Sequence, residues 1–253
     1  MRSLKLLATL PSVLIWAVAG CASYTDTQDE LTGDSVDETA QLAGSRNTTY
    51  YFEIAKDLRM CSFPTCGGWY LGRLNASATQ CHDGTWATEC YTPVLDWSSA
   101  NLSVSQQNRM LDACYQYAGA TGVFVIVRGR FARTNSTTPQ PLLGKFIITE
   151  AWLAEGDAAS AGNFVRVKDN GVRCFAAPCP SLTETTLNGS ASTDISGLDF
   201  TPAAMTADQI TTCTQETFTT DGLLVAGDRY SFVVNGTSAI GRTVTNGFYR
   251  LTN

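Results

Sequence analysis

Cysteine is the residue type in this sequence whose number and spacing could do chemistry. The chain holds nine cysteines. Cys21 follows an apolar leader, and the other eight form an even set: Cys61, Cys66, Cys81, Cys90, Cys114, Cys174, Cys179 and Cys213. An even set in an exported chain predicts disulfide bonds. A zinc site is not predicted, because the chain has no Cys-x-x-Cys motif and only one histidine, His82.

Two short loops share one pattern, a proline enclosed between two cysteines. They read CSFPTC, residues 61–66, and CFAAPC, residues 174–179. Proline fixes one backbone angle and a small disulfide loop restricts the others, so both loops are predicted to be rigid corners at strand ends. A rigid loop is also a pre-organised binding edge. The candidate binding residues are Phe63, Pro64, Thr65, Ala177 and Pro178.

The other four cysteines allow a simple pairing. Cys81 and Cys90 flank an Asp-Gly turn, which predicts a disulfide across the tip of a hairpin. Cys114 and Cys213 are then left, and a bond between them completes a symmetric set. Eight cysteines permit on the order of a hundred pairings, so the sequence favours this set without fixing it.

Candidate catalytic groups are few. The chain has no Gly-x-Ser-x-Gly, His-Glu-x-x-His, P-loop or dinucleotide-binding motif, and His82 lies at the predicted hairpin tip, where solvent is expected. Asp96 and Asp199 recur at matching positions and could do acid–base work, although turn capping suits them better. Arg130 and Arg229 also recur, and either pair with those aspartates or face solvent. No catalytic residue, cofactor or metal is therefore predicted.

The N-terminus predicts export and lipid anchoring. Two bases precede the charge-free apolar residues 6–18, a run shorter than the ~20 residues of a membrane span. Small residues and then Cys21 follow, as in a bacterial lipobox, so residues 1–20 are predicted to be a signal peptide and Cys21 to carry lipid. Ala22 favours transport onward to the outer membrane. The alternative is an ordinary signal peptide with a cysteine there by chance.

The composition of the remainder limits its partners. Residues 21–46 hold six acids and one base and are predicted to be a disordered tether. Residues 47–253 carry 14 bases and 17 acids, with no basic run, so nucleic acid and anionic membrane surfaces are poor partners. A protein or carbohydrate partner is left open. Four tryptophans could stack on a sugar ring, although core packing is commoner: Trp69, Trp86, Trp97 and Trp152.

Six Asn-x-Ser/Thr sequons stand against a bacterial envelope location, because they would accept glycans in a eukaryotic secreted protein. They begin at Asn47, Asn75, Asn101, Asn135, Asn188 and Asn235. With a lipobox ahead of them, we interpret them as a consequence of Ser/Thr-rich composition.

An internal repeat organises the chain. A shift of 113 residues places the first Cys loop on the second and Asn75 on Asn188, and a shift of 99 places Cys114 on Cys213. Matches that stay in order while the offset shrinks indicate duplication with small deletions. The two copies are residues 47–155 and 156–253, and the second lacks counterparts of Cys81 and Cys90.

Each copy is predicted to contain three strands, a helix and two further strands. The first helix runs over residues 105–117, with Ser103 or Ser105 as its N-cap. The second runs to about Phe218 and is capped by Thr206 or Asp208. The predicted fold is therefore mainly β with two helices, at the margin of the α+β class. It consists of two tandem β-β-β-α-β-β units that are disulfide-bonded and compatible with small OB-type barrels.

The combination of lipobox, acidic tether and Cys motifs resembles an uncharacterised domain family of exported lipoproteins from bacteria of the myxobacterial type. The segments that carry the resemblance are YYFEIAKDLRMCSFPTCGGWYLGRLN, CHDGTWATECY and GVRCFAAPCPSLTETTLN. The resemblance implies no activity and no site residue. We expect a non-enzymatic, surface-tethered binding or structural module. The alternatives are a protease inhibitor that uses a Cys-Pro loop and a hydrolase with an unsignalled carboxylate site.

Overall fold

The computed structural model describes residues 48–133 and 143–253. All of the described residues belong to one compact unit, Val36–Asn253. The predicted signal peptide, Cys21 and the acidic tether lie outside the described residues. Among the helices that the structure describes, none is long and apolar enough to cross a membrane.

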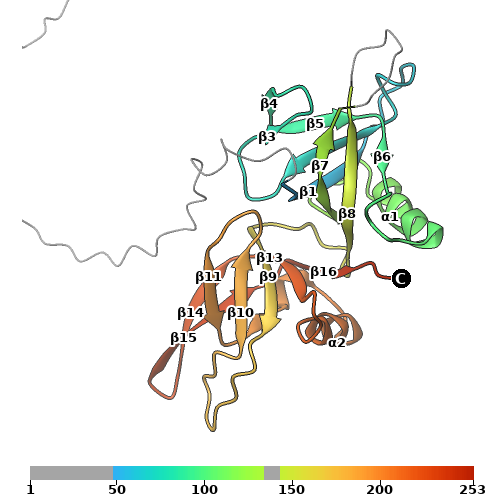
Figure 1. Ribbon diagram of the computed structural model, residues 1–253. Helices are drawn as coiled ribbons and strands as arrows, with labels where there is room; N and C mark the ends of the chain where they lie inside the picture. Colours follow the sequence, from blue (N-terminus) through green and yellow to red (C-terminus); the bar gives the residue numbers. More distant parts are fainter. Residues whose placement is uncertain (1–47, 134–142) are drawn as a thin grey trace, which may run out of the picture. The chain divides into compact units, whose positions relative to one another are not determined.

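The folded region contains two segments, each with a group of strands, one helix and a further group of strands. We call them the first half (residues 48–155) and the second half (residues 156–253). The first half has one helix, α1 (Val104–Gln116). Its strands are β1 (Tyr50–Lys56), β2 (Trp69–Arg73), β3 (Thr79–Gln80), β4 (Trp86–Ala87), β5 (Glu89–Thr92), β6 (Leu95–Asp96), β7 (Val125–Ala132) and β8 (Lys145–Ala154) (Figure 1).

The second half repeats this order with its own helix, α2 (Ala207–Glu216). Its strands are β9 (Asn163–Asp169), β10 (Leu182–Thr186), β11 (Ser192–Ile195), β12 (Leu198–Asp199), β13 (Leu223–Gly227), β14 (Arg229–Val234), β15 (Thr237–Thr243) and β16 (Asn246–Arg250). The predicted class, mainly β with two helices, is confirmed. The predicted last two strands of this half are each broken in two, at Asp228 and near Val244.

The strands of each half curl into the order of an OB-type barrel. In the first half, β1 lies between β2 and β7, β2 pairs with β5, and β7 pairs with β8, all antiparallel. A short parallel pair, β6 with β8, then brings the third and fifth strands together. The second half has the same pairings, including the parallel pair of β12 with β15. Each helix connects the third and fourth strands, as in OB-type barrels.

One continuous sheet joins the two halves. Its strand order is β11-β10-β9-β13-β16-β8-β7-β1-β2-β5, with β6 beside β8. The halves meet at the antiparallel pair of β8 with β16, where Tyr249 lies opposite Leu153. Because β8 and β16 are hydrogen-bonded to each other, neither strand has an unpaired edge at this junction.

Asn75 reinforces this junction by bonding to the second half. Its side-chain Nδ2 donates to the carbonyl oxygens of Phe164 (2.7 Å) and Leu187 (3.0 Å). Its Oδ1 accepts from the backbone N–H of Phe164 at 2.9 Å. One asparagine thus forms hydrogen bonds with three backbone groups of the second half.

Asn188 makes the mirror set of bonds to the first half. Its Nδ2 donates to the carbonyls of Tyr51 (2.7 Å) and Leu74 (2.9 Å), and its Oδ1 accepts from the Tyr51 N–H at 2.7 Å. Asn75 and Asn188 have φ of 55° and 63°, a region that asparagine tolerates better than most residues. We call this reciprocal pair the Asn clasp. It explains two of the six sequons by structure.

The helices begin as predicted. Ser103 caps α1 and Thr206 caps α2, each in a capping box with a glutamine three residues later. Each helix buries its cysteine against a separate core: Cys114 beside Met110 in the first half and Cys213 in the second. The repeated cysteines are therefore core residues at equivalent positions.

The predicted Cys114–Cys213 disulfide is wrong. Both cysteines are free and buried, and they belong to different core clusters. The other three predicted disulfides, Cys61–Cys66, Cys81–Cys90 and Cys174–Cys179, are present. The pairing was predicted from the symmetry of the two copies. Equivalent positions in a duplicated fold lie in equivalent cores, however, and need not be close to each other.

We expect two thiols, apart from Cys21, in the native protein. Burial raises the pKa of both Cys114 and Cys213 to about 12, so neither should react with iodoacetamide near neutral pH. Denaturation without reductant should release both for alkylation, counted by mass spectrometry. A count of zero alkylated thiols would show that Cys114 and Cys213 form a fourth disulfide. A count above two would show that one of the three described disulfides is absent.

The Asn clasp predicts a large loss of stability on a nearly isosteric change. Asn75→Asp replaces the donating amide with a carboxylate that faces two carbonyl oxygens, so we expect the free energy of unfolding to fall by about 2–4 kcal/mol. Asn188→Asp should do the same, as measured by urea denaturation. The control is Asn235→Asp, an exposed asparagine that also has positive φ, with an expected change below about 0.5 kcal/mol. Equal effects at the three positions would contradict a clasp.

Candidate functional site

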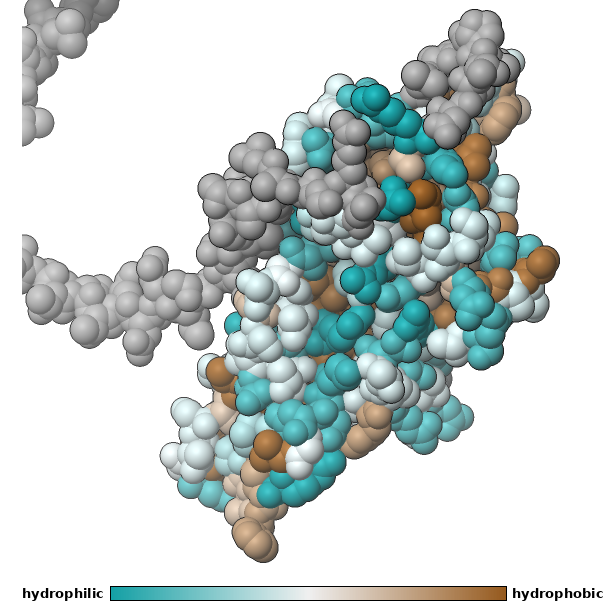
Figure 2. Space-filling model, viewed as in Figure 1, coloured by the Kyte–Doolittle hydropathy of each residue, from teal (hydrophilic) through white to brown (hydrophobic). Residues whose placement is uncertain are grey.

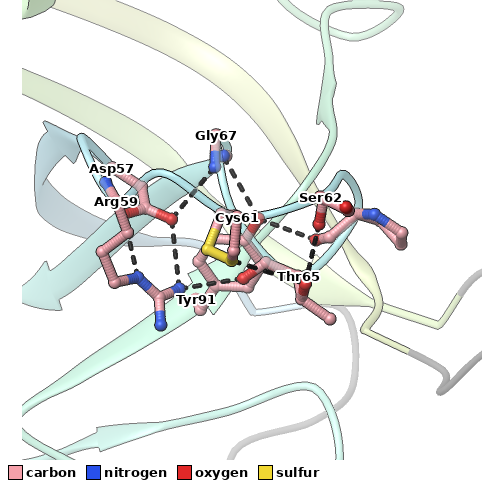
Figure 3. The surroundings of a disulfide bond; sticks show 10 residues. Asp57, Arg59, Cys61, Ser62, Thr65, Gly67 and Tyr91 are labelled. Carbon is pink, nitrogen blue, oxygen red and sulfur yellow. Dashed lines mark hydrogen bonds and ion pairs between the residues drawn. A yellow bond between two sulfur atoms is a disulfide. The ribbon is translucent and has the colours of Figure 1, made fainter.

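The first candidate site is the loop that joins β1 to β2, residues 57–68, which we call Cys loop 1. The Cys61–Cys66 disulfide closes it, and the Thr65 N–H donates to the carbonyl of Ser62 at 3.1 Å, which makes a tight turn (Figure 3). The Phe63–Pro64 peptide bond within the turn is cis. In OB-type barrels this connection is one of the loops that bind ligands.

Asp57 is the anchor of Cys loop 1. Its buried carboxylate accepts from the backbone N–H of Arg59 (3.0 Å), from the Arg59 guanidinium (3.0 and 3.1 Å) and from the Gly67 N–H (3.1 Å) (Figure 3). Hydrogen bonds from the Arg59 side chain hold the pKa of this carboxyl below its usual value. Arg59 also donates to the carbonyl of Thr65 at 2.9 Å, so the ion pair links both ends of the loop.

Tyr91 on β5 fixes the same loop from the neighbouring strand. Its hydroxyl donates to the carbonyl of Pro64 at 2.7 Å and accepts from the Gly68 N–H at 3.2 Å. Gly68 packs so closely on the backbone around Thr92 that a Cβ there would clash. With its backbone held in this way, the loop presents Leu58, Met60 and Phe63 to solvent.

Cys loop 2, residues 169–181, joins β9 to β10 in the second half. Asp169 pairs with Arg173 at 2.9 Å, and the Cys174–Cys179 disulfide closes the loop. The loop exposes Val172 and Phe175. In Figure 2 its tip, lowest in the view, is apolar. The structure therefore places the predicted binding residues on two equivalent, exposed loops.

A second candidate site lies at the other end of β1 and β2. A hollow of about 480 Å³ is bordered by the start of β1, the ends of β2 and β7, and the hairpin of residues 80–86. Because these strands are antiparallel neighbours, those termini meet at one end of the first barrel. The Cys81–Cys90 disulfide holds the hairpin over this end, and the hairpin tip predicted at Asp83-Gly84 is confirmed by a turn bond from the Gly84 N–H to the Cys81 carbonyl, 3.0 Å.

The hollow has an excess of positive charge. Three arginines line it, Arg73, Arg130 and Arg133, against one carboxylate, Asp83. Asp83 accepts from the Thr85 N–H (2.9 Å) and hydroxyl (2.7 Å), and hydrogen bonding from Thr85 lowers its pKa. None of the ion pairs between described residues involves these arginines.

The predicted carboxylate candidates lie elsewhere. Asp96 pairs with Lys145 at 2.5 Å and accepts from the Ser98 N–H, and the Lys145 contact is the main cause that lowers the Asp96 pKa to about 2. Asp199 caps a turn by accepting from the Thr201 N–H at 2.9 Å. Neither borders the hollow. In the part of the chain that the structure describes, no three metal-ligating side chains gather.

The predicted match of Arg130 with Arg229 is shifted by one residue. Gly129 pairs with Tyr50 of β1, and Gly227 pairs with the equivalent Asn163 of β9. Phe131 is therefore the structural counterpart of Arg229. The bulge between Arg128 and Gly129 shifts the strand pairing. The correct alignment of the two halves therefore cannot be obtained from sequence spacing.

The same register reveals an ion triad that sequence reasoning missed. In the second half, Glu184 pairs with Arg229 and Arg242, the latter at 2.9 Å through Nη2. Glu184 and Arg242 are fully buried. Burial alone would raise the pKa of Glu184, but the two arginines hold it below its usual value. The equivalent positions in the first half are all apolar: Leu71, Phe131 and Phe146.

The tryptophans divide between core and site. Trp69 and Trp152 are buried, and Trp97 packs against the first core. Trp86 is exposed. Both Trp86 and His82 line the hollow. The prediction that His82 is a solvated tip residue is therefore incomplete, since Gly144 approaches it so closely that a Cβ there would lie 2.6 Å from the His82 Cβ.

Fold and sites together define a doubled β-barrel protein with disulfide-closed loops and a cationic hollow in one barrel. A family model described as a domain of unknown function (DUF6748) matches residues 50–252, and the chain belongs to that family. Neither the curated proteins nor the solved structures contain a match to this chain. The family covers both halves, so it treats the doubled barrel as one domain.

Asp57→Asn should loosen Cys loop 1. The change removes a charge and leaves donors of Arg59 and Gly67 unmatched, so we expect a loss of about 1–3 kcal/mol in unfolding free energy and faster hydrogen exchange at the Gly67 amide. Because the folded pKa is lowered, this stabilisation is present above the ordinary value of 3.8 and disappears as pH falls through the folded value.

The difference in unfolding free energy between the wild type and Asp57→Asn should therefore disappear in acid. Asp83→Asn is the matched control, since Asp83 is an exposed aspartate with local partners only. Unchanged exchange at Gly67 in the Asp57 variant would show that the carboxylate does not hold the loop.

Proposed function

We propose that this protein is a bacterial cell-envelope lipoprotein, held in the outer membrane by lipid on Cys21, whose folded region binds a partner protein through its two Cys loops without catalysis. The observation that carries the proposal is the pairing of rigid backbone with exposed apolar side chains. Rigid loops lose little conformational entropy on binding, so apolar contacts made by them convert efficiently into affinity.

The apolar side chains are concentrated where the backbone is held best. Thirteen large hydrophobic residues are exposed among those the structure describes, and five of them belong to the two loops: Leu58, Met60, Phe63, Val172 and Phe175. Single exposed apolar residues are ordinary, but a group of three on one disulfide-closed loop is typical of an interaction surface. Arg59 and Tyr91, which also hold the loop backbone, form the polar surroundings that such surfaces usually have.

The two alternatives have less support. Phe63 and Thr65 are exposed, as an inhibitor loop requires, but the Thr65–Ser62 hydrogen bond closes the segment into a turn. A substrate-like inhibitor instead offers an extended segment to pair with its protease. For a hydrolase, Asp96 and Asp199 are occupied by their own partners, and the pKa of Asp96 is about 2, far from that of a general acid near neutral pH.

The location is proposed from the N-terminal sequence and the disulfides. Three disulfides in the folded region suit an oxidising compartment. Asn75 and Asn188 are engaged in the Asn clasp, so two of the six sequons have a structural reason to contain asparagine. That weakens the main argument for a glycosylated, eukaryotic protein.

The test is site-specific photo-crosslinking in intact cells. A benzoylphenylalanine in place of Phe63 should capture one defined protein, and the same substitution at Val104 should not. Val104 is the matched control, because it is 71% exposed against 68% for Phe63 and lies at the start of α1, outside both loops. Phe63→Ser and Met60→Ser in a competing copy should each lower competition for that partner by about tenfold.

The membrane arm uses Cys21→Ser. We expect this change to move the chain from the membrane fraction to the soluble fraction and to lower crosslinking at position 63. A serine variant that stays in the membrane would overturn the anchor. Equal capture from positions 63 and 104 would overturn the loop as a binding site, and a captured protease that the chain inhibits would favour the inhibitor alternative.

A further inference from the structure

We propose that the hollow at the end of the first barrel binds an acidic sugar, that is, a sugar ring that carries a carboxylate or a phosphate. This site is separate from Cys loop 1, which lies at the other ends of β1 and β2, and from Cys loop 2, which joins β9 to β10. The proposal does not depend on either loop. Its volume of about 480 Å³ falls within the range of small-molecule sites, about 300–1,000 Å³.

Arg73 is the strongest indication of an anion. It is 8% exposed, and its Nε is buried without a hydrogen-bond partner. Its guanidinium carbon lies 3.6 Å from the centre of the Tyr50 ring, which covers one face of the group and leaves its edge for in-plane hydrogen bonds. A buried cation without a carboxylate is costly, and a bound oxyanion would remove that cost.

Arg130 and Arg133 extend the positive surface from the end of β7. Neither forms an ion pair among the described residues, and the one carboxylate of the lining, Asp83, is engaged with Thr85. The second half shows the contrast, because there Glu184 supplies a carboxylate to its own arginines. Among the described residues, the three arginines of the hollow have no such carboxylate partner.

The walls of the hollow suit a sugar ring. Tyr50, Phe131 and Trp86 line it, and Trp86 is the exposed tryptophan of the four in the described residues. Aromatic faces pack against the C–H face of a sugar, and Thr48 and Gln80 add groups that can bond to hydroxyls. An aromatic wall beside arginines therefore matches a ring with one anionic substituent better than a free inorganic ion.

The site is also built and held in place. The hairpin of residues 80–86 is fixed by the Cys81–Cys90 disulfide and rests on Gly144, which has φ of 68° and no space for a side chain. The second half lacks these two cysteines. The chain thus carries an addition to one barrel that borders the hollow and has no counterpart in the other.

The experiment uses the single histidine as a reporter. His82 lines the hollow and is the chain's only histidine, so its imidazole resonances identify themselves in an NMR spectrum. Glucuronate and glucose 6-phosphate are titrated into the mature chain, with glucose as the neutral probe. We expect saturable shifts of His82 with at least one acidic probe, weakened by salt, and no saturable shift with glucose. Which acidic probe binds tells a carboxylate ligand from a phosphate ligand.

Arginine variants decide the assignment. Arg130→Gln and Arg133→Gln are changes of partly exposed or exposed side chains, and each should weaken binding about tenfold or more. Arg73→Lys keeps the charge and should still weaken binding, because it loses the planar fork. Arg109→Gln is the control, since it removes the same charge from α1 and leaves the hollow intact. Thermal melts confirm folding of each variant.

Three results would overturn the proposal. They are the absence of any His82 shift with both acidic probes, an equally strong shift with glucose, and equal weakening by Arg109→Gln and Arg130→Gln. Failure here would leave the Cys loops untouched, because their test reads crosslinking at position 63 and involves none of these arginines.

Discussion

The Asn clasp holds the two halves of this protein together. In each half, one N–H and two carbonyls beside the first two strands bond to the asparagine of the other half. Separating the halves would break these six hydrogen bonds and expose the β8–β16 edge. Buried backbone groups without partners are costly, so the two barrels are stable as a pair. This explains why the family model covers both halves together.

A shared junction of this kind allows the barrel interiors to diverge. At three equivalent positions the first half has Leu71, Phe131 and Phe146, and the second has Glu184, Arg229 and Arg242. In the first half, Phe131 and Phe146 pack edge-to-face with centroids 5.0 Å apart. The ion triad fills the same space with paired charges. A buried pair of this sort adds little net stability over an apolar equivalent, although breaking it is expensive. Either filling is therefore compatible with the fold.

Most of the fold could be predicted from the sequence, because the same local patterns occur in both copies. Strand and helix positions, both capping residues and the disulfides of the two Cys loops followed from local patterns that each copy repeats. The Cys81–Cys90 disulfide followed from the turn between its cysteines, which only the first copy has. The errors share one cause, which is that sequence spacing does not report which interior a side chain enters. Cys114 and Cys213 were paired by symmetry, and Arg130 was aligned with Arg229 across a bulge. The hollow was missed for the same reason, since Arg73 belongs to it only because β1, β2 and β7 end together.

The comparison of the two halves also separates architecture from function. Features that both halves share, such as the closed Cys loops, the capped helices and the clasp, are needed wherever this barrel is built. The hairpin of residues 80–86 and the unpaired arginines beneath it occur only in the first half of the described chain. A duplicated fold can keep its stability while one copy changes, because the junction holds both. The differences between the halves are therefore the more informative guide to ligand binding, whereas the exposed apolar residues of the Cys loops are a property that the two copies retain in common.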